Sequence, residues 1–66
     1  MTLPRYHKIE SIITNFINNL VSEKDSLSAL DRLNVRGTFD FRNFTRQIYI
    51  GYDYDSQEWI QFYKVF

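Results

Sequence analysis

The feature that most constrains the fold is the aromatic-rich second half of the chain, from Val35 to Phe66. Ten of the twelve aromatic residues lie in this stretch, and only Tyr6 and Phe16 precede it. Aromatic and β-branched residues suit the pleated, half-buried surface of a sheet, so we predict three antiparallel strands joined by turns that contain Asn, Asp and Ser. The predicted strands span residues 35–42, 47–52 and 58–65.

The first half of the chain has helical periodicity. Thr2 is a suitable N-cap, and Pro4 fits the first turn, where its missing N–H costs nothing. We therefore predict a helix over residues 4–22, followed by a polar loop and a shorter helix that is capped by Asp25 or Ser26 and runs through Leu33. No Gly or Pro separates the two helices, so a single bent helix is the alternative. The apolar stripe has spacings of three and four and consists of Tyr6, Ile9, Ile13, Phe16 and Leu20.

These elements predict a single α+β domain over residues 1–66, with two helices packed on one face of a three-stranded meander. A coiled coil is disfavoured because the helical repeat lasts barely two heptads. Pairing Phe39 with Ile50, and Ile50 with Ile60, would keep the inner face apolar and set Trp59 across from Gly51. The predicted core is Ile9, Ile13, Phe16, Ile17, Leu20, Leu30, Leu33, Phe39, Phe41, Ile48, Ile50, Ile60 and Phe62.

Composition narrows the function classes. The chain has no Cys, which excludes disulfides and thiolate metal sites and fits a cytoplasmic protein. Eight basic and eight acidic residues give no net charge, unlike a typical nucleic-acid binder. No stretch predicts a signal peptide or a membrane span. A domain of 66 residues is marginal alone, so we also consider a homodimer through the helical flank of Ile12, Ile17 and Val21.

Catalytic and cofactor motifs do not emerge from the sequence. The sequence contains no nucleophile motif that could act together with His7. Gly37 and Gly51 are isolated glycines and do not form a phosphate-binding loop. Asp53 and Asp55 lack the Gly and the distant Glu of a calcium loop. We therefore expect no enzymatic activity, no metal and no cofactor.

The predicted functional surface is the sheet face that the helices leave open. Trp, Tyr and Arg are the residue types enriched at the energetic centres of protein interfaces. The turn after the second strand adds carboxylates that could steer a basic partner. The predicted partner-binding residues are Trp59, Tyr63, Tyr49, Arg36, Arg42, Asp53 and Asp55.

Two functions fit this surface. The first is a non-catalytic protein-interaction module, a small inhibitor or regulator that occupies a surface on a larger protein, by analogy with small inhibitors from phages and mobile elements. The second is a small nucleic-acid-binding or transcription-modulating protein that stacks bases on the same aromatic face. Zero net charge and the carboxylates of Asp40, Asp53 and Asp55 favour the first.

Overall fold

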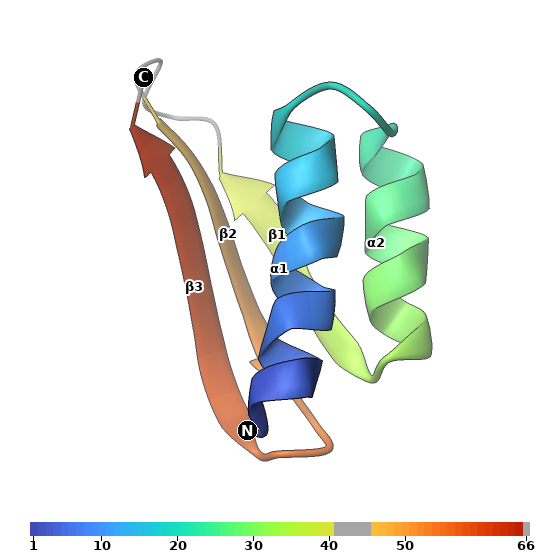
Figure 1. Ribbon diagram of the computed structural model, residues 1–66, viewed down its shortest axis with the longest axis vertical. Helices are drawn as coiled ribbons and strands as arrows, with labels where there is room; N and C mark the ends of the chain where they lie inside the picture. The colour runs from blue at the N-terminus through green and yellow to red at the C-terminus, as the bar shows by residue number, and fades with distance from the viewer. Residues whose placement is uncertain (41–45, 66) are drawn as a thin grey trace.

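The computed structural model describes the backbone of residues 1–40 and 46–65 and the side chains of residues 1–40 and 49–62. Two helices precede a three-stranded antiparallel sheet, which confirms the predicted α+β class (Figure 1). The elements are α1 (Leu3–Ile17), α2 (Glu23–Arg32), β1 (Val35–Asp40), β2 (Arg46–Asp53) and β3 (Glu58–Val65).

The helix boundaries differ from the prediction. α1 follows Thr2, as predicted, but it ends at Ile17 because Asn19 adopts a left-handed backbone with φ of 61°. α2 begins earlier than predicted, since the hydroxyl of Ser22 accepts the backbone N–H of Asp25 at 3.1 Å and caps the helix. The alternative of one bent helix is therefore wrong.

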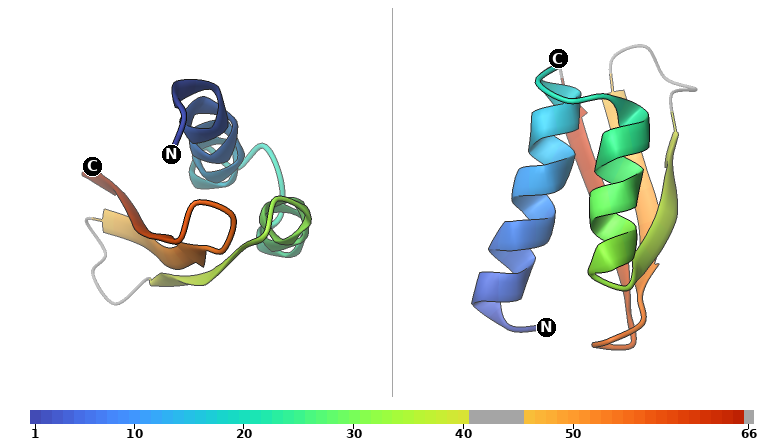
Figure 2. Two further views of the ribbon diagram at one scale, coloured as in Figure 1. Left: turned by 90° about the horizontal axis from the view of Figure 1, so that it is seen from below. Right: turned by 90° about the vertical axis from the view of Figure 1, so that its right-hand side faces the viewer.

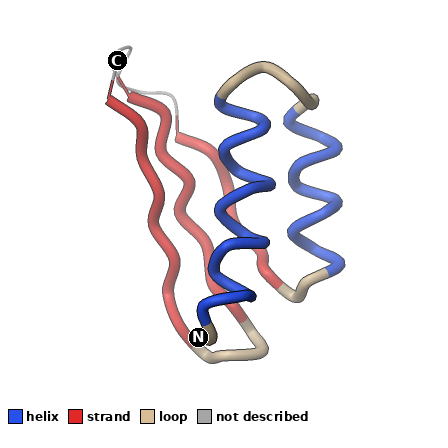
Figure 3. The backbone as a smooth tube through the Cα atoms, in the orientation of Figure 1, coloured by secondary structure: helices blue, strands red, loops and turns tan. Residues whose placement is uncertain are grey.

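The sheet is a meander in the order β1-β2-β3, and both helices pack on one side of it (Figures 2 and 3). We call the helix-covered side the inner face and the other side the outer face. Among the parts of the chain that the structure describes, no segment covers the outer face. The predicted residues Phe41 and Arg42 and the predicted turn at 43–46 lie largely outside the described residues.

The strand register differs from the prediction by one residue in β2. Tyr49 pairs with Phe39 and Phe62, whereas Ile50 pairs with Thr38 and Gln61. Because side chains alternate along a strand, this shift exchanges the two faces of β2. Tyr49 is fully buried and Ile50 is 40% exposed, so the predicted positions of both residues are wrong. Trp59 lies across from Tyr52 instead of Gly51.

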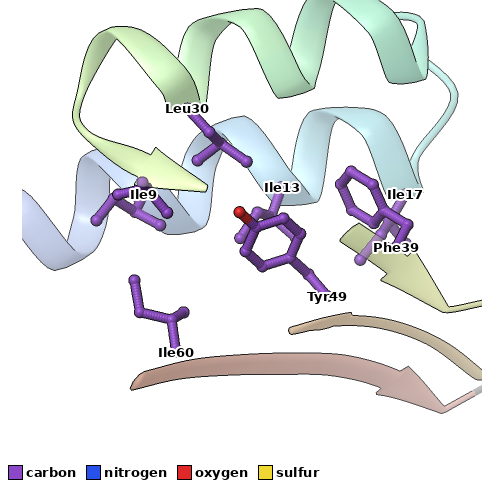
Figure 4. Close-up of a cluster of buried hydrophobic side chains, with 8 residues drawn as sticks. Ile9, Ile13, Ile17, Leu30, Phe39, Tyr49 and Ile60 are labelled. Carbon is purple, nitrogen blue, oxygen red and sulfur yellow. The ribbon is translucent and has the colours of Figure 1, made fainter. Parts of the chain in front are cut away.

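Two paired glycines permit the close packing around the inward-facing Tyr49. Gly37 and Gly51 are paired on neighbouring strands, and a Cβ atom at Gly51 would lie 2.7 Å from the Tyr49 ring. Gly51 therefore leaves the space that the phenol ring needs, and Gly37 lets the backbones of β1 and β2 approach closely. Figure 4 shows the ring directed from β2 towards the helices. The ring meets that of Phe39 edge-on, with 5.1 Å between the two centroids.

The core lies between the helices and the inner face. The structure confirms six predicted residues as buried, while three others pack against them as partly buried residues and Leu20 is 71% exposed. Sequence reasoning missed Val35, which is 1% exposed, and Tyr49. The side chain of Ile48 lies outside those described. The confirmed buried residues are Ile9, Ile13, Ile17, Leu30, Phe39 and Ile60, and the partly buried ones are Phe16, Leu33 and Phe62.

Candidate interaction surface

One row of side chains crosses all three strands on the outer face. Tyr52 of β2 pairs with Arg36 of β1 on one side and with Trp59 of β3 on the other. We call these three residues the outer row. Trp59 is 77% exposed, the largest exposed fraction among the large hydrophobic residues that the structure describes. A Trp, a Tyr and an Arg side by side are the combination favoured at interface centres.

Contacts between aromatic rings restrict the side-chain orientations on this surface. The rings of Tyr52 and Trp59 meet edge to face with centroids 5.1 Å apart, and Tyr54 meets Tyr52 in the same way at 4.9 Å. Such pairs contribute about 0.5–1.5 kcal/mol each beyond area burial. Ile50, in the adjacent row, adds an exposed aliphatic side chain. The surface is therefore partly preorganised before any partner binds.

Arg36, the cation of the outer row, forms only a weak ion pair within the chain. The Nε atom of Arg36 donates to Oδ1 of Asp31 at 2.9 Å, and both side chains are more than half exposed. An exposed ion pair contributes about 0–1 kcal/mol. Arg36 can therefore exchange Asp31 for an acidic group of a partner at little cost.

The turn after β2 is less acidic at its surface than we predicted, because the side chain of Asp53 faces inward. Its carboxylate is buried and accepts two hydrogen bonds from Arg5, each at 2.8 Å. These bonds, and the backbone N–H groups of Asp55 and Ser56, hold the pKa of Asp53 well below its usual range despite its burial. Asp53 is thus a structural ion-pair residue, and its predicted role in steering a partner is wrong.

Asp55 remains at the surface but is already engaged. Its Oδ1 atom accepts from the side-chain amide of Asn34 at 2.9 Å, and its Oδ2 atom lies 3.6 Å from Arg5. Half of its side chain is exposed. With Asp53 neutralised by Arg5, the turn offers one accessible carboxylate rather than a strongly acidic patch.

The structure brings together only part of the predicted site. Arg36 and Trp59 share the outer row, whereas Tyr49 is buried in the core. Arg42 lies outside the described residues, and Tyr63 belongs to β3 but its side chain is not among those described. Sequence reasoning missed Tyr52 and Ile50 because the predicted register turned the even-numbered residues of β2 inward. It placed Tyr54 in the turn after the second strand and gave it no role.

Other predicted sites also change. Ile17 is buried and Ile12 packs against the core, so the helical flank that we considered for a homodimer is not an open stripe. Within residues 1–40 and 46–65, no three His, Cys, Asp or Glu side chains converge on a common point where they could hold a metal ion. No helix in this part of the chain is long and apolar enough to cross a membrane.

Neither a protein-family model, nor a curated protein, nor a solved structure matches this chain.

Proposed function

We propose that this protein is a non-catalytic interaction module that binds a larger protein through the outer face of its sheet. The observation that supports this proposal most strongly is the 77% exposure of Trp59 within the outer row. A single exposed apolar residue is common on protein surfaces, but an exposed indole beside Tyr52, Tyr54 and Ile50 forms a contiguous apolar patch. Patches of this kind, bordered by polar residues, mark binding sites.

In the proposed complex the indole of Trp59 inserts into an apolar pocket of the partner. Tyr52 supports the indole from the side and is itself held by Tyr54, so little side-chain entropy is lost on binding. Arg36 leaves Asp31 and pairs with a carboxylate next to that pocket, which adds specificity more than affinity. The partner surface therefore combines an apolar depression with an acidic rim.

We propose further that binding inhibits or regulates the partner by occupying this surface. The comparison with small inhibitors of phages and mobile elements is an analogy that rests on size and on the exposed aromatic patch. A chain without Cys needs no oxidising compartment, so we propose that this interaction takes place in the cytoplasm.

The experiment compares three purified baits in native-host lysate: wild type, Trp59→Ala and Leu20→Ala. Leu20 is a matched control, since it is 71% exposed but lies outside the outer face. A captured protein is then purified, and its affinity for each bait is measured. We expect Trp59→Ala to weaken binding by at least tenfold and Leu20→Ala to leave it unchanged. Equal binding by all three baits would contradict the proposal.

A nucleic-acid ligand is tested with the same variants. The single Trp reports directly on base stacking through fluorescence quenching by a single-stranded oligonucleotide. The outer face offers such a ligand one described arginine, and that arginine is paired with Asp31. We expect no quenching at low salt, while strong and steeply salt-dependent quenching would favour the alternative function.

A further inference from the structure

The free edge of β3 is a second surface, adjacent to the aromatic patch, and Trp59 belongs to both. β3 pairs with β2 on one side, and no described strand lies on its other side (Figure 3). It spans eight residues, Glu58–Val65, and contains neither Gly nor Pro. Proteins usually protect a long, regular edge from pairing with other chains by bulges, prolines or several charged residues. β3 lacks the first two and carries only Glu58 and Lys64 as charged residues.

An apolar groove runs beside this edge. It lies between the first turn of α1 and β3, has a volume of about 510 Å³, and includes Leu3, Tyr6, Ile60 and Phe62 in its lining. Leu3 is 67% exposed and Tyr6 is 38% exposed, so much apolar surface meets water here. The ring of Tyr6 contacts Phe62 at 5.5 Å between centroids. β1, the other edge strand, is shorter and contains Gly37.

Symmetry limits how two copies of β3 could pair. A two-fold axis perpendicular to the sheet makes the strands antiparallel and keeps all helices on one side. Residues opposite each other then belong to the same face, so the axis must pass between two identical residues. Four choices overlap most of β3, with the axis at Ile60, Gln61, Phe62 or Tyr63.

Only the axis at Gln61 makes the strand complementary to itself. It places residue 58 opposite residue 64, which pairs Glu with Lys, and it places Ile60 opposite Phe62. It also sets Trp59 opposite residue 63, a Tyr. An axis at Ile60 would set residue 58, a Glu, against residue 62, a Phe. An axis at Phe62 would set residue 64, a Lys, against residue 60, an Ile, and an axis at Tyr63 would set residue 64 against residue 62. Opposite charges and matched apolar or aromatic residues are the pairs that stabilise antiparallel strands.

We propose that two copies of this chain form a homodimer by antiparallel pairing of β3 with β3 about Gln61. The two sheets join into one continuous sheet, and the two grooves meet over the Ile60 and Phe62 pairs. The exposed apolar surface of Leu3 and Tyr6 then lies beside the dimer axis on the helix side. Glu58 already binds the N-terminal ammonium at 2.7 Å, and the pairing sets position 64 of the second copy opposite it.

The test is a charge exchange at the two ends of β3. Glu58→Lys and Lys64→Glu each set like charges opposite each other at both ends of the pairing, and the double variant restores opposite charges. Within one chain these residues are six positions apart, about 20 Å along the strand, so they cannot rescue each other inside a monomer. The molar mass of each variant is measured by sedimentation between about 1 μM and about 1 mM.

We expect wild type and the double variant to approach twice the monomer mass of 8.0 kDa at the upper concentrations. Each single variant should dimerise about tenfold more weakly, with unchanged circular dichroism. A wild type that stays monomeric would overturn the proposal, as would a dimer that neither single variant weakens or a double variant that fails to recover. If Glu58→Lys does not fold, Lys64→Glu and the wild-type mass decide the question. None of these changes replaces a residue of the outer row, so partner binding is tested with a different variant, Trp59→Ala, at a protein concentration where the dimer dissociates.

Discussion

Arg5 holds Asp53 through two parallel N–H···O bonds of 2.8 Å and thereby ties the first turn of α1 to the end of β2. The guanidinium group also donates to the backbone carbonyl of Leu33, just before β1. One side chain thus joins three segments that are far apart in sequence. Asp53 is fully buried, so its carboxylate is stable in the charged form only while the hydrogen bonds from Arg5 are made.

Replacing Arg5 with Met should destabilise the fold strongly. The change leaves the Asp53 carboxylate buried without its cation, and loss of one partner of a buried pair costs about 3–5 kcal/mol. Arg36→Met is the matched control, because it removes an exposed pair with Asp31 and should cost less than about 1 kcal/mol. Urea unfolding of both variants measures the difference. Equal free energies of unfolding would show that the Arg5 pair is not buried in solution.

Acid should weaken the protein through the same carboxylate. The pKa of Asp53 is lowered in the folded state, chiefly by the hydrogen bonds from Arg5. Its stabilisation is therefore complete above the ordinary aspartate pKa of about 4 and is lost as the pH falls below that value towards the folded pKa. Asp53→Asn should flatten the decline of the unfolding free energy between about pH 5 and about pH 3. An unchanged slope in that variant would assign the acid sensitivity to other carboxylates.

Tyr49→Phe should leave stability unchanged or raise it slightly at neutral pH. The Tyr49 hydroxyl is buried and has no hydrogen-bond partner within the described part of the chain. Removing a buried polar atom that lacks a partner can gain up to about 1 kcal/mol. Denaturant unfolding at pH 7 measures this gain. A loss of more than about 1 kcal/mol would reveal a hydrogen bond to the hydroxyl in solution.

The same tyrosine predicts a loss of stability in alkali. Burial raises the pKa of Tyr49 to about 12 in the folded state. The unfolded chain releases this proton near pH 10, so its contribution to stability is complete below about pH 10 and disappears as the pH approaches about 12. Wild type should therefore lose more stability than Tyr49→Phe over this interval. Parallel curves for the two proteins would place the phenol at the surface.

The sequence predicts the helices and the meander because both rest on local patterns. Spacings of three and four define α1, and the polar residues of the turns separate the strands. The end of α1 depends on the left-handed backbone of Asn19, which no periodicity reveals. The register of β2 was not predicted, because either its even-numbered or its odd-numbered side chains could face the helices. The even-numbered set contains the isoleucines, which are more hydrophobic than Tyr49, Gly51 and Asp53 of the odd-numbered set. The choice between them rests on contacts across the fold, such as Arg5 with Asp53.

This register is tested by the two paired glycines. A Cβ at Gly37 would lie 2.2 Å from the backbone oxygen of Ile50, whereas a Cβ at Gly51 would meet the ring of Tyr49 at 2.7 Å. Backbone atoms cannot move as freely as a side chain, so Gly37→Ala should destabilise more than Gly51→Ala, with each costing at least about 1–3 kcal/mol. Thermal unfolding of both variants gives the order. Two variants as stable as wild type would exclude this pairing.

The most direct test of an open outer face is the accessibility of Trp59 to a fluorescence quencher. The chain has one Trp, so the signal needs no assignment, and the side chain is 77% exposed in the isolated protein. The measurement uses acrylamide at about 1 μM protein, where an edge dimer of modest affinity dissociates. We predict quenching close to that of free tryptophan and emission typical of an indole in water. Strong protection of the folded monomer with blue-shifted emission would mean that the indole is buried, and the proposed binding surface would not exist.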